Sequence, residues 1–256
     1  MQAVTNQEND KMKQKYQELC MWGESEFQKM YLAEDENHRT WMKKVLPLTA
    51  LPLYQELLSL DNIHLVRIRE VWQEENACIV IEEFINGYTL SDYMKLKELT
   101  CLTPEVALAY TAEVCDGLEE LHQHGIIHRD IKPENLMLSN DGILKISDYN
   151  IARLHREDAG SDTQILGTQG FAAPEQFGYR QTDARSDIYS VGVLLNVLLT
   201  GKLPSECLYQ GRRDIQQIIL RAAAIEPKDR YANVKKMKRE IRKIIGKRGR
   251  WGRYGR

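Results

Sequence analysis

The sequence lacks clustered cysteines, a long apolar segment and a surplus of charge of either sign. Its five cysteines are scattered without a CxxC pair, which argues against a thiolate zinc site and predicts reduced thiols. The longest apolar run, residues 191–199, is interrupted by Gly192 and Asn196 and is too short to cross a bilayer. The formal net charge is -2, so charge gives no reason to expect nucleic acid as a partner.

The two ends of the sequence are polar. The N-terminal residues are charged and do not have the pattern of a secretory signal, so we expect a cytoplasmic protein. The last ten residues, KRGRWGRYGR, contain five basic residues and three glycines. Such a segment can touch acidic lipid or nucleic acid, but a solvated tail is the interpretation we favour.

The first third of the chain has a β-rich pattern and the remainder a helical one, with the change at Asn86-Gly87. β-branched and aromatic residues between polar turns predict strands at residues 30–33, 40–46, 66–72 and 77–84. Two further short strands are predicted at residues 136–138 and 144–146. Apolar residues at helical spacing predict helices at residues 53–60, 90–99, 104–124, 183–200, 214–224 and 234–245.

The strongest chemical signal is the segment IHRDIKPEN at residues 127–135, followed by ISDYN at residues 146–150. Asp130 can orient a hydroxyl group and accept its proton. Asn135 and Asp148 offer hard oxygen ligands of the kind that Mg²⁺ prefers. Lys132 can neutralise charge that builds on a transferred group. Together these residues suit phosphoryl transfer, which depends on positioning and on electrostatic stabilisation.

With these motifs the chain resembles the eukaryotic-like protein kinase family. The lysine two residues after Asp130 is the serine/threonine version, and GFAAPEQ followed by TDARSDIYSVGVLL indicates a bacterial type. The resemblance covers residues 16–245 and is strongest after Gly87. It implies an α+β, protein-kinase-like two-lobe fold, with a small β-rich N-lobe and a larger, mainly helical C-lobe.

The resemblance also implies a division of the chain. We expect a polar N-terminal extension at residues 1–15, an N-lobe at 16–84, a hinge at 85–90, a C-lobe at 91–246 and a basic tail at 247–256. Adenine would lie against the hinge region, with Glu83 and Ile85 as binding residues.

Further roles follow from the resemblance in the C-lobe. Thr168 matches the threonine that contacts the catalytic loop, and Asp187 matches the aspartate that braces this loop. Arg230 matches the arginine that pairs with the glutamate at position 175.

Arg129 precedes Asp130 and matches an arginine that often receives a phosphate from the activation segment. Ser161 and Thr163 are the nearest candidates for that phosphate, although ordinary solvated loop residues are an equal interpretation.

The N-lobe departs from the family pattern. Of the glycine-rich sequence G-x-G-x-x-G-x-V, residues 23–30 keep only Gly23. Ser25 and Gln28 hinder close approach of a phosphate, and Glu24 and Glu26 repel it. We therefore expect this loop to bind phosphate more weakly than is usual in the family.

Two neighbouring residues, Lys43 and Lys44, compete for the role of the phosphate-binding lysine. If Lys43 has it, Trp41 falls where a small residue normally lies over adenine. If Lys44 has it, Met42 takes that place, and its flexible side chain is better tolerated. We favour Lys44.

The acidic partner of this lysine is also displaced. The family pattern puts Leu53 where the glutamate normally lies. Glu56 lies one turn further on, and Glu82 falls on the strand beside the lysine, where a buried carboxylate needs a cation. We expect Glu82 or Glu56 to be the partner and place Glu82 ahead; the alternative is an outward-facing Glu82.

The triplet Asp148-Tyr149-Asn150 stands where the family has Asp-Phe-Gly. Tyr149 can fill the apolar space of the phenylalanine. Asn150 tolerates left-handed backbone angles, so we expect both changes to be compatible with the family's backbone conformation.

The sequence therefore predicts a signalling enzyme, a serine/threonine protein kinase that transfers the γ-phosphate of ATP to protein hydroxyls. Mg²⁺ is the expected metal, with Mn²⁺ as the alternative. Expected partners are ATP and protein substrates, without nucleic acid or a membrane span, and the resemblance allows a homodimer. The alternatives are a pseudokinase-like nucleotide-binding or scaffolding module and a small-molecule kinase of related fold.

Overall fold

The computed structural model describes residues 15–25, 28–154, 167–177 and 182–248. The chain divides into two compact units, residues 1–86 and residues 87–256. Within the described ranges, none of the helices has the length and apolar character needed to span a membrane.

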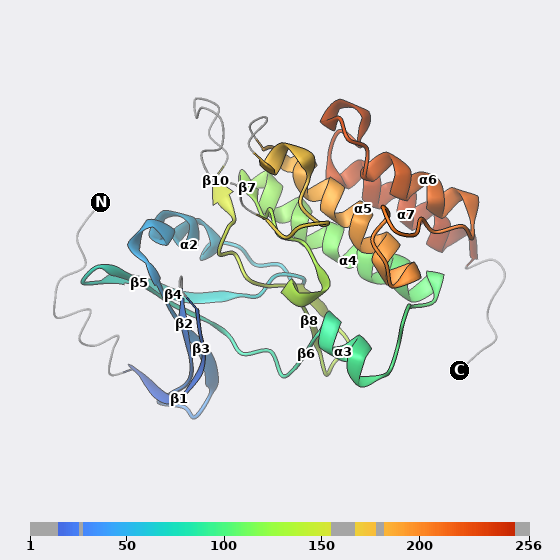
Figure 1. The fold of residues 1–256 in the computed structure, drawn as a ribbon. Coiled ribbons are helices and arrows are strands. Elements are labelled where there is room, and N and C mark those ends of the chain that lie inside the picture. Colours follow the sequence, from blue (N-terminus) through green and yellow to red (C-terminus); the bar gives the residue numbers. More distant parts are fainter. Residues whose placement is uncertain (1–14, 26–27, 155–166, 178–181, 249–256) are drawn as a thin grey trace. The chain divides into compact units, whose positions relative to one another are not determined.

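The N-terminal unit is built on a five-stranded antiparallel sheet in the order β1-β2-β3-β5-β4 (Figure 1). Its strands are β1 (Tyr16–Glu24), β2 (Lys29–Asp35), β3 (Thr40–Pro47), β4 (Ile68–Glu74) and β5 (Ala77–Glu83). The four strands predicted in this region are present with small shifts at their ends. Strand β1 was not predicted, because most of its residues are exposed and it shows no apolar alternation.

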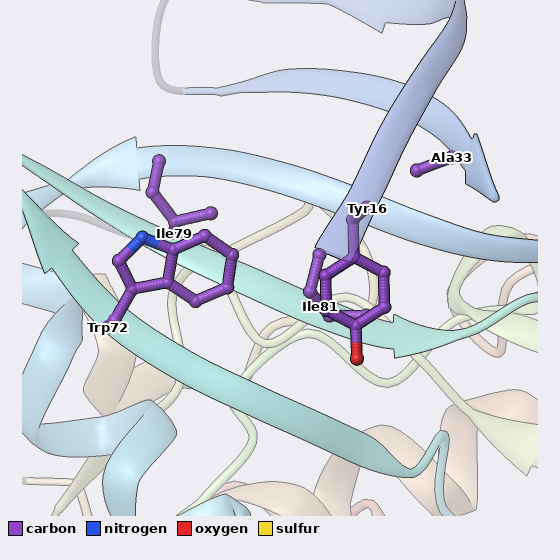
Figure 2. Packing of buried hydrophobic residues seen from close by; sticks show 5 residues of the cluster. All are labelled: Tyr16, Ala33, Trp72, Ile79 and Ile81. Carbon is purple, nitrogen blue, oxygen red and sulfur yellow. The ribbon is translucent and has the colours of Figure 1, made fainter. Parts of the chain in front are cut away.

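One face of this sheet has its own apolar cluster. Tyr16, Ala33, Trp72, Ile79 and Ile81 are all buried there, as Figure 2 shows. Successive side chains of a strand point to opposite faces, so the other face is left for a different set of residues. That second face carries the ion pair between Lys44 and Glu82.

The only α-helix of the described part of this unit is short. The 3-10 turn η1 (Leu48–Ala50) leads directly into α2 (Leu51–Leu57). The prediction of residues 53–60 began too late, because Pro52 lies in the first turn of the helix, where a missing N–H costs nothing.

The C-terminal unit is mainly helical. Its helices are α3 (Leu90–Leu96), α4 (Pro104–Gln123), α5 (Ala184–Thr200), α6 (Arg213–Ala222) and α7 (Val234–Arg248). Helix α4 packs against α5 and α7, and α5 packs against α6 (Figure 1). The hydroxyl of Thr103 caps α4 and the carboxylate of Asp183 caps α5, while Gly201 ends α5 in the left-handed region at φ 71°. The five predicted helices of this unit are therefore confirmed.

Short strands hold the loops of the C-terminal unit. Strands β6 (Gly87–Thr89), β8 (Leu136–Ser139) and β9 (Leu144–Ile146) form one sheet, and β7 (Ile126–Ile127) pairs with β10 (Arg153–Leu154). The 3-10 turns are η2 (Pro133–Asn135), η3 (Pro174–Phe177) and η4 (Pro227–Asp229). The segment with the candidate catalytic residues thus runs from β7 through η2 into β8.

Candidate active site

Asp187 fixes the loop after β7 through hydrogen bonds to its backbone. Its carboxylate is fully buried and accepts hydrogen bonds from the peptide N–H groups of His128 (2.9 Å) and Arg129 (2.7 Å). The imidazole Nε2 of His122 lies 2.8 Å from the same carboxylate. Burial raises the pKa of Asp187, but the contacts with His122 and the loop outweigh it and hold the pKa below its usual range. An ionised Asp187 therefore fixes the backbone just before Asp130.

Asp130 lies at the centre of a hydrogen-bonded cluster. Its Oδ1 accepts from the Thr168 hydroxyl at 2.7 Å, and its Oδ2 accepts from the Asn135 amide at 2.8 Å. The ammonium group of Lys132 lies 2.8 Å from Oδ2 and donates to the Thr168 hydroxyl at 2.6 Å. The structure thus brings together all three predicted catalytic residues, Asp130, Lys132 and Asn135, and adds the threonine that the resemblance indicated.

The electrostatics of this cluster favour a charged Asp130. Burial raises the pKa of its carboxyl group, but the hydrogen bonds from Lys132, Thr168 and Asn135 outweigh burial and leave the pKa below the usual aspartate range. Asp130 is therefore a carboxylate at neutral pH, as an acceptor for a hydroxyl proton requires.

Asn135 is placed to offer oxygen to a cation. Its amide nitrogen donates to the carbonyl and to the carboxylate of Asp130, both at 2.8 Å, so the amide oxygen is the atom left for coordination. The peptide carbonyl of Asn135 accepts from the N–H of Ser147 at 2.9 Å, which ties η2 to the residue just before Asp148. Oxygen donors from Asn135 and Asp148 fit a hard divalent cation.

The triplet at residues 148–150 has one left-handed residue. Asp148 adopts the left-handed region at φ 61°, whereas Asn150, which tolerates that region, does not adopt it. Aspartate tolerates this conformation better than most residues. Tyr149 is buried as predicted, contacts the ring of His128 edge-on at 5.6 Å between centroids and donates its hydroxyl to the Ile146 carbonyl.

The segment at residues 167–177 is anchored by a buried ion pair. The guanidinium group of Arg230 binds both oxygens of the Glu175 carboxylate, at 2.6 and 2.8 Å. Ser186 donates to the same carboxylate at 2.8 Å. Burial raises the pKa of Glu175, but Arg230 outweighs burial and holds the pKa below its usual range. The pairing expected from the resemblance is present.

Gln176 is a further anchor, one that we did not predict from the sequence. It is fully buried, and its amide donates to the Arg129 carbonyl at 2.8 Å and accepts from the Ala173 N–H at 3.1 Å. Gly167, at φ 127°, has no room for a side chain, because a Cβ would lie 2.8 Å from the Gln176 amide. The only indication in the sequence was a polar residue next to Glu175, and a single glutamine belongs to no motif that would predict its role.

Arg129 is 4% exposed and has a left-handed backbone at φ 70°. The two residues proposed to bring it a phosphate, Ser161 and Thr163, lie outside the described part of the chain. Their role stays a prediction.

In the N-terminal unit, the two candidate lysines have different partners. The ammonium group of Lys44 lies 2.8 Å from the Glu82 carboxylate, and these side chains are only 5% and 7% exposed. Lys43, on the opposite face of β3, lies 2.7 Å from Glu18 of β1. Glu56 of α2 is exposed, and Leu53 is buried. The hypothesis that Glu82 pairs with the neighbouring strand's lysine agrees with this geometry, and the outward-facing Glu82 does not.

The strand register links Lys44 to the candidate glycine. Gly23 of β1 pairs with Met30 of β2, Met30 pairs with Lys44 of β3, and Lys44 pairs with Val80 of β5. Gly23 and Lys44 therefore lie in one row across the sheet. Of the polar residues expected to hinder phosphate approach, Glu26 lies outside the described residues.

The candidate adenine-binding residues follow β5. Glu83 is the last residue of that strand, and its peptide N–H donates to the Arg67 carbonyl at 2.9 Å. Its carboxylate accepts from the Arg67 N–H at 2.7 Å. Ile85 lies just beyond the strand, outside any regular element.

Comparison with known proteins gives a consistent family. The family described as protein kinase domain matches residues 29–250. Serine/threonine-protein kinase PknB of Mycobacterium tuberculosis is 31% identical over 218 residues, which cover 74% of this chain and 34% of the relative. Probable serine/threonine-protein kinase CPE1738 of Clostridium perfringens is 30% identical over 181 residues, which cover 70% and 26%. Probable serine/threonine-protein kinase PknB of Lactococcus lactis is 28% identical over 207 residues, which cover 72% and 33%.

The antiparallel N-terminal sheet, the helical C-terminal unit and the cluster around Asp130 define the class as a protein kinase with an α+β fold. The chain belongs to the protein kinase domain family, and its similarity is to bacterial serine/threonine kinases of the eukaryotic-like type. It spans about a third of the length of the first of these relatives.

Proposed function

We propose that this chain is the catalytic part of a serine/threonine protein kinase that transfers the γ-phosphate of ATP to protein hydroxyl groups. The observation that carries the proposal is the cluster in which Lys132, Thr168 and Asn135 all contact the Asp130 carboxylate or one another at hydrogen-bonding distance. Three polar groups around one carboxylate hold it in one orientation, as an in-line phosphoryl transfer requires.

Each residue has a proposed role. Asp130 orients the serine or threonine hydroxyl and accepts its proton, and Lys132 neutralises charge on the transferred group. Protein kinases use ATP together with a divalent cation, and Asn135 and Asp148 supply oxygen ligands for it. We propose Mg²⁺, with Mn²⁺ as the alternative.

The remaining nucleotide contacts are proposed for the N-terminal unit. Lys44, in preference to Lys43, binds the α- and β-phosphates, and Gly23 lies near them on the same row of the sheet. Glu83 and Ile85 receive the adenine. The buried carboxylate of Glu82 beside Lys44 supports the choice, because Lys43 contacts instead Glu18, whose side chain is 43% exposed.

The proposed domain limits, 16–84 for the N-lobe, 85–90 for the hinge and 91–246 for the C-lobe, stay predictions. The 1–15 and 247–256 segments lie almost wholly outside the described residues. Protein substrates follow from the kinase class, whereas a homodimer and a cytoplasmic location stay predictions of the sequence.

The experiment that tests this proposal is transfer of labelled phosphate from Mg-ATP to the purified protein and to a generic basic protein substrate. Asp148→Ala is the control, because it removes a proposed metal ligand. Transfer that the variant abolishes supports an active kinase. Absence of transfer, with nucleotide still raising Tm, contradicts the proposal and favours the pseudokinase; absence of both contradicts nucleotide binding as well.

A further inference from the structure

The Lys44–Glu82 pair is buried in an apolar part of the sheet. The neighbours across the strands are Met30 and Val80 beside Lys44, and Met42 and Ile68 beside Glu82. Neither charge has more than a few per cent of its side chain exposed to water. Loss of either side chain would therefore remove an ion pair from a buried position.

Both partners belong to the same sheet. Met42 of β3 lies directly opposite Glu82 of β5, so Lys44, two residues further on, is the diagonal neighbour of Glu82 on one face. The hydrogen bonds between β3 and β5 fix this spacing. A glutamate on a helix would instead place the lysine only when the helix lies at the right distance.

Helix α2 does not supply such a glutamate. Leu53, at the position that the family pattern assigns to it, is an apolar residue 8% exposed. Glu56 is exposed on the same helix. Within the described part of the N-terminal unit, the ion pair to Lys44 comes from β5 and not from α2.

We infer that Glu82 is the positioning residue for Lys44, and that it keeps this lysine ready for phosphate binding whatever the position of helix α2. The inference rests on the proposed kinase function, since it takes nucleotide phosphates as the ligand of Lys44. An ammonium group has three donors, so Lys44 can keep its bond to Glu82 while another donor contacts a phosphate oxygen. A movement of helix α2 would then not change the position of the Lys44 ammonium group.

The chain offers a matched control in the pair Lys43–Glu18. This pair has nearly the same length, 2.7 Å, and joins the residue next to Lys44 to a strand of the same sheet. Lys43 lies on the opposite face of β3, and the Glu18 side chain is 43% exposed. Loss of Glu18 removes an ion pair of the same type without touching Lys44.

The test is a double-mutant cycle on nucleotide affinity, measured by calorimetric titration with Mg-ADP. Glu82→Gln is expected to weaken binding about tenfold, within the coupling range of residues in contact. In the Lys44→Met background the same substitution is expected to change affinity by less than about twofold. Glu18→Gln and Glu56→Gln are expected to leave affinity within about twofold of the wild type.

A second series guards against misfolding. Glu82→Asp keeps the charge and is expected to retain more affinity than Glu82→Gln. The pair Lys44→Met with Glu82→Met carries no buried charge, so it is expected to fold and to match the affinity of Lys44→Met alone. Circular dichroism and Tm are recorded for every variant.

Three results would overturn the inference: Glu82→Gln binding as tightly as the wild type, equal weakening by Glu82→Gln with and without Lys44, or weakening by Glu56→Gln. A wild-type chain that binds no nucleotide would overturn it too. The readout requires no phosphate transfer. A chain that binds nucleotide in the expected pattern but transfers no phosphate would overturn the proposed function and leave this inference standing.

Discussion

At the scale of single residues, the proposed chemistry depends on the charge and direction of one carboxylate. Asp130 accepts hydrogen bonds from Thr168 on one oxygen and from Asn135 on the other, with the Lys132 ammonium group beside it. Asparagine at this position keeps the shape but replaces one acceptor by a donor and removes the negative charge. The donors around it would then face a group that cannot accept from all of them.

Asp130→Asn is therefore expected to lower kcat by about 10²- to 10⁴-fold, the usual value of a positioned proton acceptor. The KM for ATP is expected to change little, because the proposed phosphate and metal ligands are other residues. Steady-state phosphate transfer measures both constants. Asp141→Asn, on an exposed turn, is the control. Turnover equal to the wild type in Asp130→Asn would contradict the assigned role.

The sequence predicts single residues well where a motif fixes their chemistry. Asp130, Lys132 and Asn135 lie together as expected, because the motif is local and its residues are adjacent in the chain. The sequence favours Lys44 over Lys43, and the strand register adds that the two lysines occupy opposite faces of β3. Which of them binds phosphate stays a prediction. The sequence does not indicate which residue of the 148–150 triplet is left-handed, because aspartate and asparagine both tolerate that conformation.

At the scale of elements, a buried ion pair joins η3 to the segment after α6. Glu175 and Arg230 are 5% and 2% exposed, and removal of one partner from such a pair leaves an uncompensated charge. Glu175→Gln is expected to lower the free energy of unfolding at pH 7 by about 3 kcal/mol. Glu134→Gln, on an exposed position of η2, is expected to stay within about 0.5 kcal/mol.

The difference in unfolding free energy between the wild type and Glu175→Gln depends on pH, because the pKa of Glu175 is lowered in the folded state. A carboxyl group with a lowered pKa in the folded state contributes its full stability above its unfolded value, here 4.5, and loses it as the pH falls through the folded value. The stability gap between wild type and Glu175→Gln is therefore expected to be constant from pH 7 to about 5 and to narrow below 4.5. Urea unfolding at several pH values measures it; a gap that does not narrow would contradict the pair's role.

Helices and strands with a clear apolar pattern were predicted from the sequence more closely than those without one. Helices α4 and α5 bury many apolar residues and begin at clear caps, Thr103 and Asp183, so the sequence predicts their positions closely. Strand β1 exposes seven of its nine residues and gives no such pattern. The two-residue strands β7 and β10 form only because their partner strand is supplied by a distant part of the chain.

At the scale of the whole molecule, the chain has two compact units. The similarity to bacterial kinases covers most of this chain but about a third of the first relative, so other parts of those proteins say nothing about this one. A test on the whole chain is whether a single ligand, Mg-ATP, raises its free energy of unfolding.

Ligand binding to the folded state raises the free energy of unfolding by RT ln(1 + [L]/Kd), about 2.7 kcal/mol at a hundredfold excess over Kd. Mg-ATP is therefore expected to raise Tm by several degrees in the wild type. If Asn135 and Asp148 hold the cation, chelation of the metal with EDTA should remove most of this rise. In Asp148→Ala the rise is already small, so EDTA should change it little.

This comparison separates the metal from the nucleotide, because Asp148→Ala leaves the N-terminal unit with Lys44 and its partner intact. A rise in Tm that survives EDTA in the wild type would mean that the nucleotide binds without the cation, and the proposed metal ligands would be wrong. A rise restored in the wild type by Mn²⁺ as fully as by Mg²⁺ would leave the site open to either metal. A rise restored by Mg²⁺ alone would select the smaller of two ions that both accept oxygen donors such as those of Asn135 and Asp148.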